Sequence, residues 1–175
     1  VALDFMGKTL GVDSALLREN DAYNRRLAAR LVEKIRPHIP AGASVGVLGL
    51  AYKPHSHVVE ESPGVAICQA LADQGYRVLG HDPLAVESAR GILQYRAVLC
   101  PDLKEVLEQS EVLILTTTDP AYQKLVKEKG FPSEKVRLVV DPWRIMAGVS
   151  GGKTRVLSFG MGSEEVPETL RHLWS

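Results

Sequence analysis

The chain has 175 residues, of which 45% are hydrophobic and 24% are charged, a composition typical of one soluble globular domain. Lysine plus arginine and aspartate plus glutamate both number 21, so the net charge is zero, which argues against a dedicated nucleic-acid-binding protein. No apolar run approaches about 18 residues, so we expect no membrane span. The two cysteines, Cys68 and Cys100, make no disulfide or zinc framework, and we expect a cytoplasmic protein.

A long amphipathic helix is the first predicted element, over about residues 13–38. Apolar residues recur along one face of it at spacings of three, four or seven: Leu16, Tyr23, Leu27, Leu31 and Ile35. At 1.5 Å per residue this helix would span about 35–40 Å, which is long for a helix in a small domain. We therefore expect the stripe to pack, at least partly, against a second copy of the chain or against another domain.

Short apolar runs then alternate with helical segments. The first run, 44–50, is almost unbroken, as expected for a strand buried on both faces. Ser62 and Pro63 follow as the N-cap and first residue of a helix that stops at Gly75. Further strands are predicted over 76–80, 97–99, 112–116, 136–140 and 155–159, and further helices over 84–90, 102–109 and 120–129. This alternation predicts an α/β fold: a doubly wound, mostly parallel sheet of about six strands, preceded by a long N-terminal helix.

The loop after the first strand is the first place to look for a ligand, because doubly wound sheets bind ligands at the carboxyl ends of their strands. The sequence there reads GVLGLAYKP and lacks the dinucleotide fingerprint G-x-G-x-x-G. Twelve residues, 50–61, separate the strand from Ser62, against a usual strand-to-helix loop of about 2–6. Such a loop either holds a ligand or is a variable surface excursion.

Two glycine patterns near the C-terminus are weaker. Residues 151–154 resemble the end of a phosphate-binding loop, but Ala147 stands where that motif needs glycine, so we interpret them as a turn. Residues 160–162, Gly-Met-Gly, either let the backbone approach a ligand or form a plain turn.

Other polar and thiol side chains give no catalytic or metal site. Asp82 ends the second strand, where it could bind a ribose or cap the turn at Pro83. His55 and His57 lack the spacing of metal ligands, so we assign no metal site. Both cysteines are interpreted as small core residues. No catalytic residue is assigned.

Residues 45–83 resemble the C-terminal domain of the UDP-glucose/GDP-mannose dehydrogenase family, in which a strand runs into G-L-[AS]-[FY]-K-x-x-[TS]-x-D-x-R-E-[SA]-P and the next strand ends in Asp-Pro. The matching residues are Gly49, Leu50, Ala51, Tyr52, Lys53, Ser56, Glu61, Ser62, Pro63, Asp82 and Pro83. Residues 141–144 look like the family's D-x-R segment after the fifth strand. Residues 2–35 are similar to the central helix that joins the family's two Rossmann-like domains, with Asn20 where that helix carries an Asn.

The resemblance implies a connecting and dimerisation helix over 1–40 and a Rossmann-like nucleotide-sugar-binding domain over 41–175. Family members oxidise the C6 alcohol of a nucleotide sugar to a carboxylate with two NAD molecules, supply polysaccharide biosynthesis, and dimerise through the central helix. Tyr52, Lys53 and Arg144 are then expected to contact a UDP- or GDP-sugar. The family's NAD fingerprint and catalytic thiol precede the matched segments, so we assign no cofactor-binding residue and expect no turnover by this chain alone.

Two residues depart from the family's pattern. Val58 and Glu60 stand where the family's loop has Asp and Arg. An acid at position 60 would oppose a diphosphate by about 1 kcal/mol at 4 Å in water. Two other functions therefore stay open: a non-catalytic nucleotide-binding or regulatory module, and an interaction domain that dimerises through its N-terminal helix and binds no nucleotide.

Overall fold

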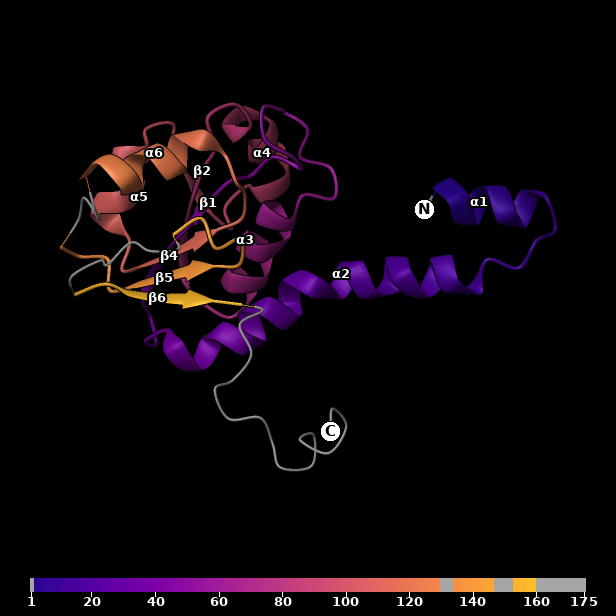
Figure 1. Cartoon of the computed structure of the whole chain (residues 1–175), viewed down its shortest axis with the longest axis horizontal. Helices are drawn as coiled ribbons and strands as arrows, with labels where there is room; N and C mark the ends of the chain where they lie inside the picture. The colour runs from indigo at the N-terminus through magenta and orange to yellow at the C-terminus, as the bar shows by residue number, and fades with distance from the viewer. Residues whose placement is uncertain (1, 130–133, 147–152, 160–175) are drawn as a thin grey trace, which may run out of the picture.

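The computed structural model describes residues 2–129, 134–146 and 153–159. One sheet of six parallel strands forms its centre, in the order β3-β2-β1-β4-β5-β6 (Figure 1). The strands are β1 (Ser44–Leu48), β2 (Arg77–His81), β3 (Val98–Leu99), β4 (Val112–Leu115), β5 (Leu138–Asp141) and β6 (Arg155–Ser158). The chain starts in the middle, winds outward to β3, then crosses over to β4 and winds outward to β6. The predicted doubly wound sheet is confirmed, and its switch point lies between β1 and β4.

Helices cover both faces of the sheet. On one face lie α3 (Pro63–Asp73), α4 (Val86–Leu93) and the C-terminal part of α2 (Ala15–Ile35). On the other lie α5 (Leu103–Gln109) and α6 (Pro120–Lys129). Two apolar clusters therefore form, one on each side, as a three-layer α/β fold requires.

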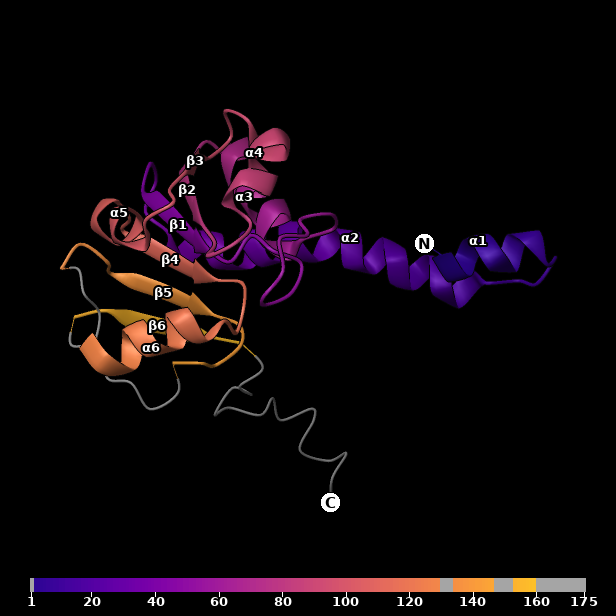
Figure 2. The ribbon, with the colours of Figure 1, turned by 90° about the horizontal axis from the view of Figure 1, so that it is seen from above.

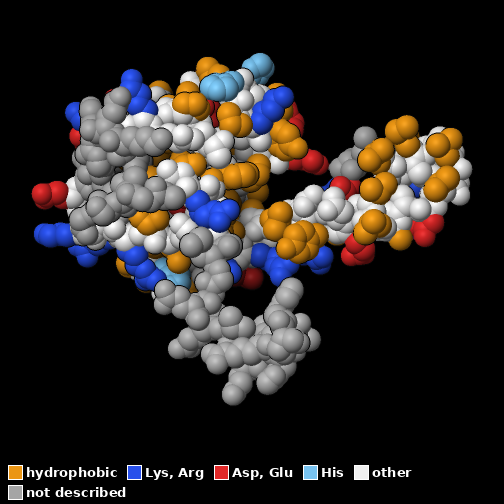
Figure 3. All heavy atoms as spheres, viewed as in Figure 1, with side chains coloured by type: hydrophobic (Ala, Val, Ile, Leu, Met, Phe, Trp, Pro, Cys, Tyr) orange, Lys and Arg blue, Asp and Glu red, His pale blue; other side chains and the backbone are white. Residues whose placement is uncertain are grey.

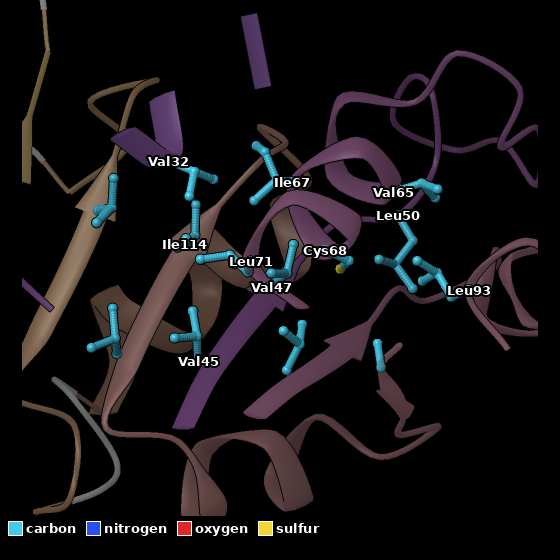
Figure 4. Packing of buried hydrophobic residues seen from close by; sticks show 14 of the residues in the cluster. Val32, Val45, Val47, Leu50, Val65, Ile67, Cys68, Leu71, Leu93 and Ile114 are labelled. Atoms are coloured by element: carbon cyan, nitrogen blue, oxygen red, sulfur yellow. The ribbon is translucent and has the colours of Figure 1, made fainter. Parts of the chain in front are cut away.

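Side chains of the central strands alternate between these two clusters. Val45 and Val47 of β1 pack toward α3, as Figure 4 shows, whereas Leu48 belongs to the cluster under α5 and α6. Every residue of β1 is buried, which confirms the interpretation of its unbroken apolar run. Burying one such side chain contributes about 1.5–3 kcal/mol.

The N-terminal region contains the predicted long helix and one helix more. The helix predicted over about 13–38 is confirmed with shifted ends: α2 spans Ala15–Ile35, and Arg36–His38 form a 3-10 turn. Pro37 lies in that turn, where its missing N–H ends the α-helical hydrogen bonding. A separate helix that the pattern did not predict, α1 (Ala2–Thr9), precedes α2. Figures 1 and 2 show α1 and the first part of α2 as an arm that projects away from the sheet.

The apolar stripe of α2 is only partly covered by its own domain. Ile35 is fully buried against the sheet, whereas Leu16 is 83% exposed and Tyr23 and Leu27 are about half exposed. Hydrophobic side chains are exposed on α1 as well, among them Leu3, Phe5 and Met6, so the arm carries several exposed apolar groups (Figure 3). Within the described ranges, no helix is both long and apolar enough to span a membrane.

The remaining predicted elements are confirmed with small shifts at their ends. The helix predicted over 84–90 is α4 at Val86–Leu93, and the strand predicted over 136–140 is β5 at Leu138–Asp141. The first strand ends at Leu48 rather than at residue 50 because Gly49 has φ +109°, which turns the chain out of the sheet.

Candidate functional site at the carboxyl edge of the sheet

The loop after β1 leaves the sheet through a tightly packed corner. Gly49 donates its N–H to the carbonyl oxygen of His81 at 2.9 Å. The Thr116 hydroxyl donates to the carbonyl oxygen of Leu48 at 2.9 Å and also contacts that of Gly49. A Cβ on Gly64 would overlap the Gly49 carbonyl oxygen, so the first turn of α3 approaches β1 this closely only because residue 64 is glycine. The corner fixes both ends of the loop.

Local hydrogen bonds shape the loop itself. Ser62 caps α3 by accepting from the N–H of Val65 at 3.3 Å, which confirms the predicted N-cap. The N–H of Tyr52 donates to the carbonyl oxygen of Val58 at 2.7 Å, which closes the loop on itself. Tyr52 is 58% exposed and Lys53 is also exposed, so both side chains face outward at the carboxyl edge.

Asp82 accepts four backbone hydrogen bonds. Its Oδ1 accepts from the N–H groups of Leu84 and Ala85 at 2.9 and 2.8 Å, which favours the capping interpretation. Its Oδ2 accepts from Leu50 and Ala51 at 2.8 and 3.0 Å. Both carboxylate oxygens are therefore occupied by backbone groups, which argues against the alternative role as a ribose ligand.

The turn after β5 presents Arg144. Asp141 is fully buried, and its carboxylate accepts from the N–H groups of Ile145 and Met146 at 3.2 and 2.8 Å. Arg144 donates its N–H to the carbonyl oxygen of Asp141 and has φ +57°, a left-handed conformation that is uncommon outside glycine. Its side chain is exposed.

Lys53 and Arg144 project from the same edge of the sheet. One strand, β4, separates β1 from β5, so the ends of these strands lie about 10 Å apart at about 4.8 Å per strand. Neither side chain forms an ion pair with another described residue. Both cations are therefore available to an anionic ligand.

The two loop residues that depart from the family's pattern, Val58 and Glu60, are also exposed. Glu60 is exposed, and its Oε2 accepts from the backbone N–H of Val59 at 3.2 Å. Val58 is 42% exposed. His55 and His57 lie in the same loop and are exposed as well. Within residues 2–129, 134–146 and 153–159, no three His, Cys, Asp or Glu side chains are grouped so that they could hold a metal ion.

Sequence reasoning missed a buried polar pair behind the edge. His81 Nδ1 lies 2.9 Å from the Tyr122 hydroxyl, which also donates to the carbonyl oxygen of His81 at 3.1 Å. Burial lowers the pKa of His81 and raises that of Tyr122 above its usual range. The two residues are 41 positions apart, and no spacing in the sequence connects them.

A polar cleft between α1 and α2 was missed as well, because α1 was not predicted. It encloses about 490 Å³ and is lined mainly by charged side chains: Asp4, Lys8, Arg18, Asp21, Arg25 and Arg26. Asp4 pairs with Lys8 of its own helix at 2.8 Å. It links α1 to the start of α2 by accepting from the Ser14 hydroxyl at 2.6 Å and by its ion pair with Arg18 at 3.5 Å. The hydrogen bonds from Lys8 and Ser14 lower the pKa of Asp4 to about 2.

The cysteines are buried free thiols, as their interpretation as core residues predicts. Burial raises the pKa of the Cys68 thiol to about 12 and raises that of Cys100 as well. Of the two glycine patterns, residues 160–162 lie outside the described residues, and so do the two glycines of 151–154.

Comparison with known proteins decides the family. A sequence model described as the UDP binding domain of the UDP-glucose/GDP-mannose dehydrogenase family matches residues 46–148, more than half of the chain. The chain belongs to this family. The resemblance carried by the Gly49–Pro63 segment and the Asp-Pro pairs is thereby confirmed, and the match is to the UDP-binding C-terminal region of the dehydrogenases.

Individual dehydrogenases of the family give the same result. A UDP-glucose 6-dehydrogenase of Rhizobium meliloti is 30% identical over 123 residues, which are 70% of this chain and 28% of that protein. The solved UDP-glucose dehydrogenase of Pyrobaculum islandicum has 34% identity and a TM-score of 0.62, covering 90% of this chain and 34% of that one. The solved GDP-mannose dehydrogenase of Pseudomonas aeruginosa has 25% identity and a TM-score of 0.61, covering 90% and 36%. This chain thus spans about a third of the length of these dehydrogenases.

Proposed function

We propose that this chain is the nucleotide-sugar-binding part of an NAD-dependent nucleotide-sugar 6-dehydrogenase, which oxidises the alcohol of a UDP- or GDP-sugar to a carboxylate. One observation carries the proposal. In a domain of the UDP-binding type, Lys53 and Arg144 are exposed at the same sheet edge, and neither pairs with an acid in the part of the chain that the structure describes. Parallel α/β sheets bind their ligands at this edge.

The chemistry of the two cations suits a diphosphate. Lysine supplies a compact point charge on a flexible stem, whereas the planar guanidinium of arginine can make two parallel hydrogen bonds to one phosphate. The left-handed backbone at Arg144 and the closed loop at Lys53 hold the two residues in place before a ligand arrives. Tyr52 adds an exposed aromatic ring beside Lys53 for contact with the sugar or the base.

The role of NAD follows from the proposed reaction rather than from residues of this chain. Oxidising an alcohol to a carboxylate needs a hydride acceptor, which NAD supplies, and a nucleophile that holds the aldehyde stage covalently. Cys68 and Cys100 are poor candidates because their thiols are buried and their pKa values are raised. We therefore expect the isolated chain to bind nucleotide and to produce no NADH.

The N-terminal arm supports a homodimer. In this proposal residues 1–40 connect and dimerise, and residues 41–175 bind the nucleotide sugar. Leu16, Tyr23 and Leu27 leave an apolar surface on α2 that a second copy would cover. The same proposal places the protein in the cytoplasm, where free thiols persist, and assigns its product to polysaccharide biosynthesis.

The test is calorimetry with UDP, UDP-glucose, GDP and NAD on the parent, Lys53→Ala and Arg144→Ala. We expect binding of a UDP or GDP compound, weakened at least fivefold by either substitution. The matched control is Arg77→Ala, since Arg77 is an exposed arginine at the opposite end of β2, and it should leave affinity unchanged. An NADH absorbance assay runs in parallel.

Two outcomes would contradict the proposal, and one observation would support an alternative to it. Failure of every nucleotide to bind at millimolar concentration would favour the interaction domain that binds none. Binding that survives both substitutions would remove the proposed site. The exposed acid Glu60 favours one alternative, a non-catalytic nucleotide-binding or regulatory module. A coding sequence with no dehydrogenase domain upstream of Val1 would support that alternative.

A further inference from the structure

Two Asp-Pro steps lie at the carboxyl ends of strands of the sheet. Asp82 is the first residue after β2, and Asp141 is the last residue of β5; a proline follows each. Both aspartates are buried, with exposed fractions of 7% and 0%. Each carboxylate accepts hydrogen bonds from the two backbone N–H groups of a short turn that follows it.

Asp82 also reaches the neighbouring strand. Its Oδ2 holds the N–H groups of Leu50 and Ala51, which are 32 and 31 positions earlier and immediately precede Tyr52. The direction in which the loop carries Tyr52 and Lys53 therefore depends on a carboxylate at the end of β2.

Asp141 acts on the second cation in a comparable way. Its carbonyl oxygen accepts from the N–H of Arg144 at 3.3 Å, and its carboxylate accepts from the next two residues, Ile145 and Met146. Hydrogen bonds to Asp141 therefore hold the backbone at Arg144 and at the two residues after it. These bonds maintain the left-handed conformation of Arg144.

Backbone groups satisfy both carboxylates, and neither forms an ion pair with a described lysine or arginine. An ionised carboxylate has two oxygens that only accept, so it suits a cluster of N–H donors. An asparagine in the same place keeps one accepting oxygen and turns an NH₂ group toward the remaining donors. The acids therefore order the two cationic segments without neutralising Lys53 or Arg144.

We propose that Asp82 and Asp141 are positioning residues for the nucleotide diphosphate: Asp82 sets the Tyr52–Lys53 segment, and Asp141 sets Arg144. This inference rests on the proposed function, because Lys53 and Arg144 must contact the ligand. It assigns each cation its own acid, so the two pairs act independently of one another.

A double-mutant cycle measured by UDP calorimetry tests this pairing. Asp82→Asn should weaken UDP binding at least fivefold, and should weaken it little further in a Lys53→Ala background. In an Arg144→Ala background, by contrast, Asp82→Asn should weaken UDP binding by the same factor as in the parent. Asp141→Asn should show the opposite pattern. It should weaken UDP binding little further in an Arg144→Ala background, and by its full factor in a Lys53→Ala background.

Two further variants separate positioning from loss of stability. Asp82→Ser keeps one acceptor for the turn at Leu84 while losing the reach to Leu50, and it should weaken binding as Asp82→Asn does. Asp102→Ala removes an exposed aspartate cap away from the two cationic segments, since Asp102 accepts from the N–H of Lys104 at 2.9 Å at the start of α5. It should lower the melting temperature and leave UDP affinity unchanged.

Tryptophan fluorescence gives an independent signature. Trp143 is 55% exposed and adjoins Arg144, and replacing Trp174 by Phe leaves it as the only tryptophan. Asp141→Asn should shift the Trp143 emission, whereas Asp82→Asn should not.

Some results would overturn the inference. Each acid variant is combined with each cation variant, which gives four double variants. If the losses of UDP affinity multiply in all four, the acids do not act through their assigned cations. The same conclusion would follow if Asp102→Ala lost as much UDP affinity as Asp82→Asn. Unchanged UDP binding in Asp82→Ser and Asp141→Asn would do the same. If Lys53→Ala and Arg144→Ala themselves have no effect, the proposed function fails first.

Discussion

The first turn of α3 packs directly on the end of β1, with Gly64 against the carbonyl oxygen of Gly49. A Cβ on Gly64 would overlap that oxygen, and the contact is with rigid backbone rather than with a flexible side chain. The separation of α3 from the sheet, and with it the geometry of the loop between them, therefore depends on one missing methyl group.

Gly64→Ala should lower the free energy of unfolding by about 3 kcal/mol, because α3 must move away from β1. Urea denaturation measures this change. Gly91→Ala is the matched control: Gly91 lies in α4 with open space around its Cβ position. That variant should gain about 0.5–1 kcal/mol from higher helix propensity. Equal effects of the two substitutions would contradict the close packing.

Removing the Tyr122 hydroxyl should destabilise the domain without emptying its core. Tyr122→Phe keeps the buried ring but leaves Nδ1 of His81 without its hydroxyl partner. A lost hydrogen bond of this kind costs about 1–3 kcal/mol when the remaining group stays buried. Urea denaturation at pH 7.5 should show a loss in this range, and a fully stable variant would contradict the bond's importance.

The pH dependence of stability should carry a contribution from His81. Burial lowers the pKa of His81 in the folded state, so below its unfolded pKa of about 6.5 the unfolded chain binds the proton more readily. The stabilisation is complete above about pH 6.5 and declines as the pH falls through the folded pKa. His81→Asn should show a smaller loss of unfolding free energy between pH 7.5 and 5.5 than the parent. An equal loss in both proteins would exclude His81 as the cause.

Neutralising Glu60 should strengthen nucleotide binding. If UDP occupies the carboxyl edge, the exposed Glu60 carboxylate repels its phosphates by about 1 kcal/mol at 4 Å in water. Glu60→Gln should then raise UDP affinity by about threefold to fivefold. This gain should shrink at high salt, because salt screens the repulsion in the parent. Glu108→Gln, an exposed position near the end of α5, serves as the control and should change nothing. Unchanged affinity in Glu60→Gln would mean that the phosphates lie away from the loop.

A charge on the arm should weaken self-association. Leu16 is 83% exposed on α2, and Leu16→Asp would place a carboxylate in the interface that the proposed homodimer buries. Light scattering over a range of concentrations should show a dimer for the parent and a shift toward monomer for the variant. Leu84→Asp, at a 59% exposed leucine remote from the arm, should dimerise as the parent does. A parent that is monomeric at every concentration would contradict the dimer.

Local sequence patterns determined most elements and the family of this protein. The unbroken apolar run at 44–50 and the Ser62-Pro63 start of α3 both encode conformation within a few residues. The Asp-Pro pairs, together with the segment from Gly49 to Pro63, were enough to identify the UDP-glucose/GDP-mannose dehydrogenase family before any coordinates. At the N-terminus the periodic stripe predicted α2, whereas no pattern that we used predicted α1.

Only the tertiary structure decided what the buried polar residues do. Asp82 is a cap by its local sequence, yet half of its hydrogen bonds go to Leu50 and Ala51, because β2 lies beside β1 in the sheet. His81 meets Tyr122 only because α6 crosses the face onto which His81 points. Such partners are set by strand order and helix packing, which act here between residues 31 to 41 positions apart. Periodicity and turn chemistry extend over only a few residues and cannot encode them.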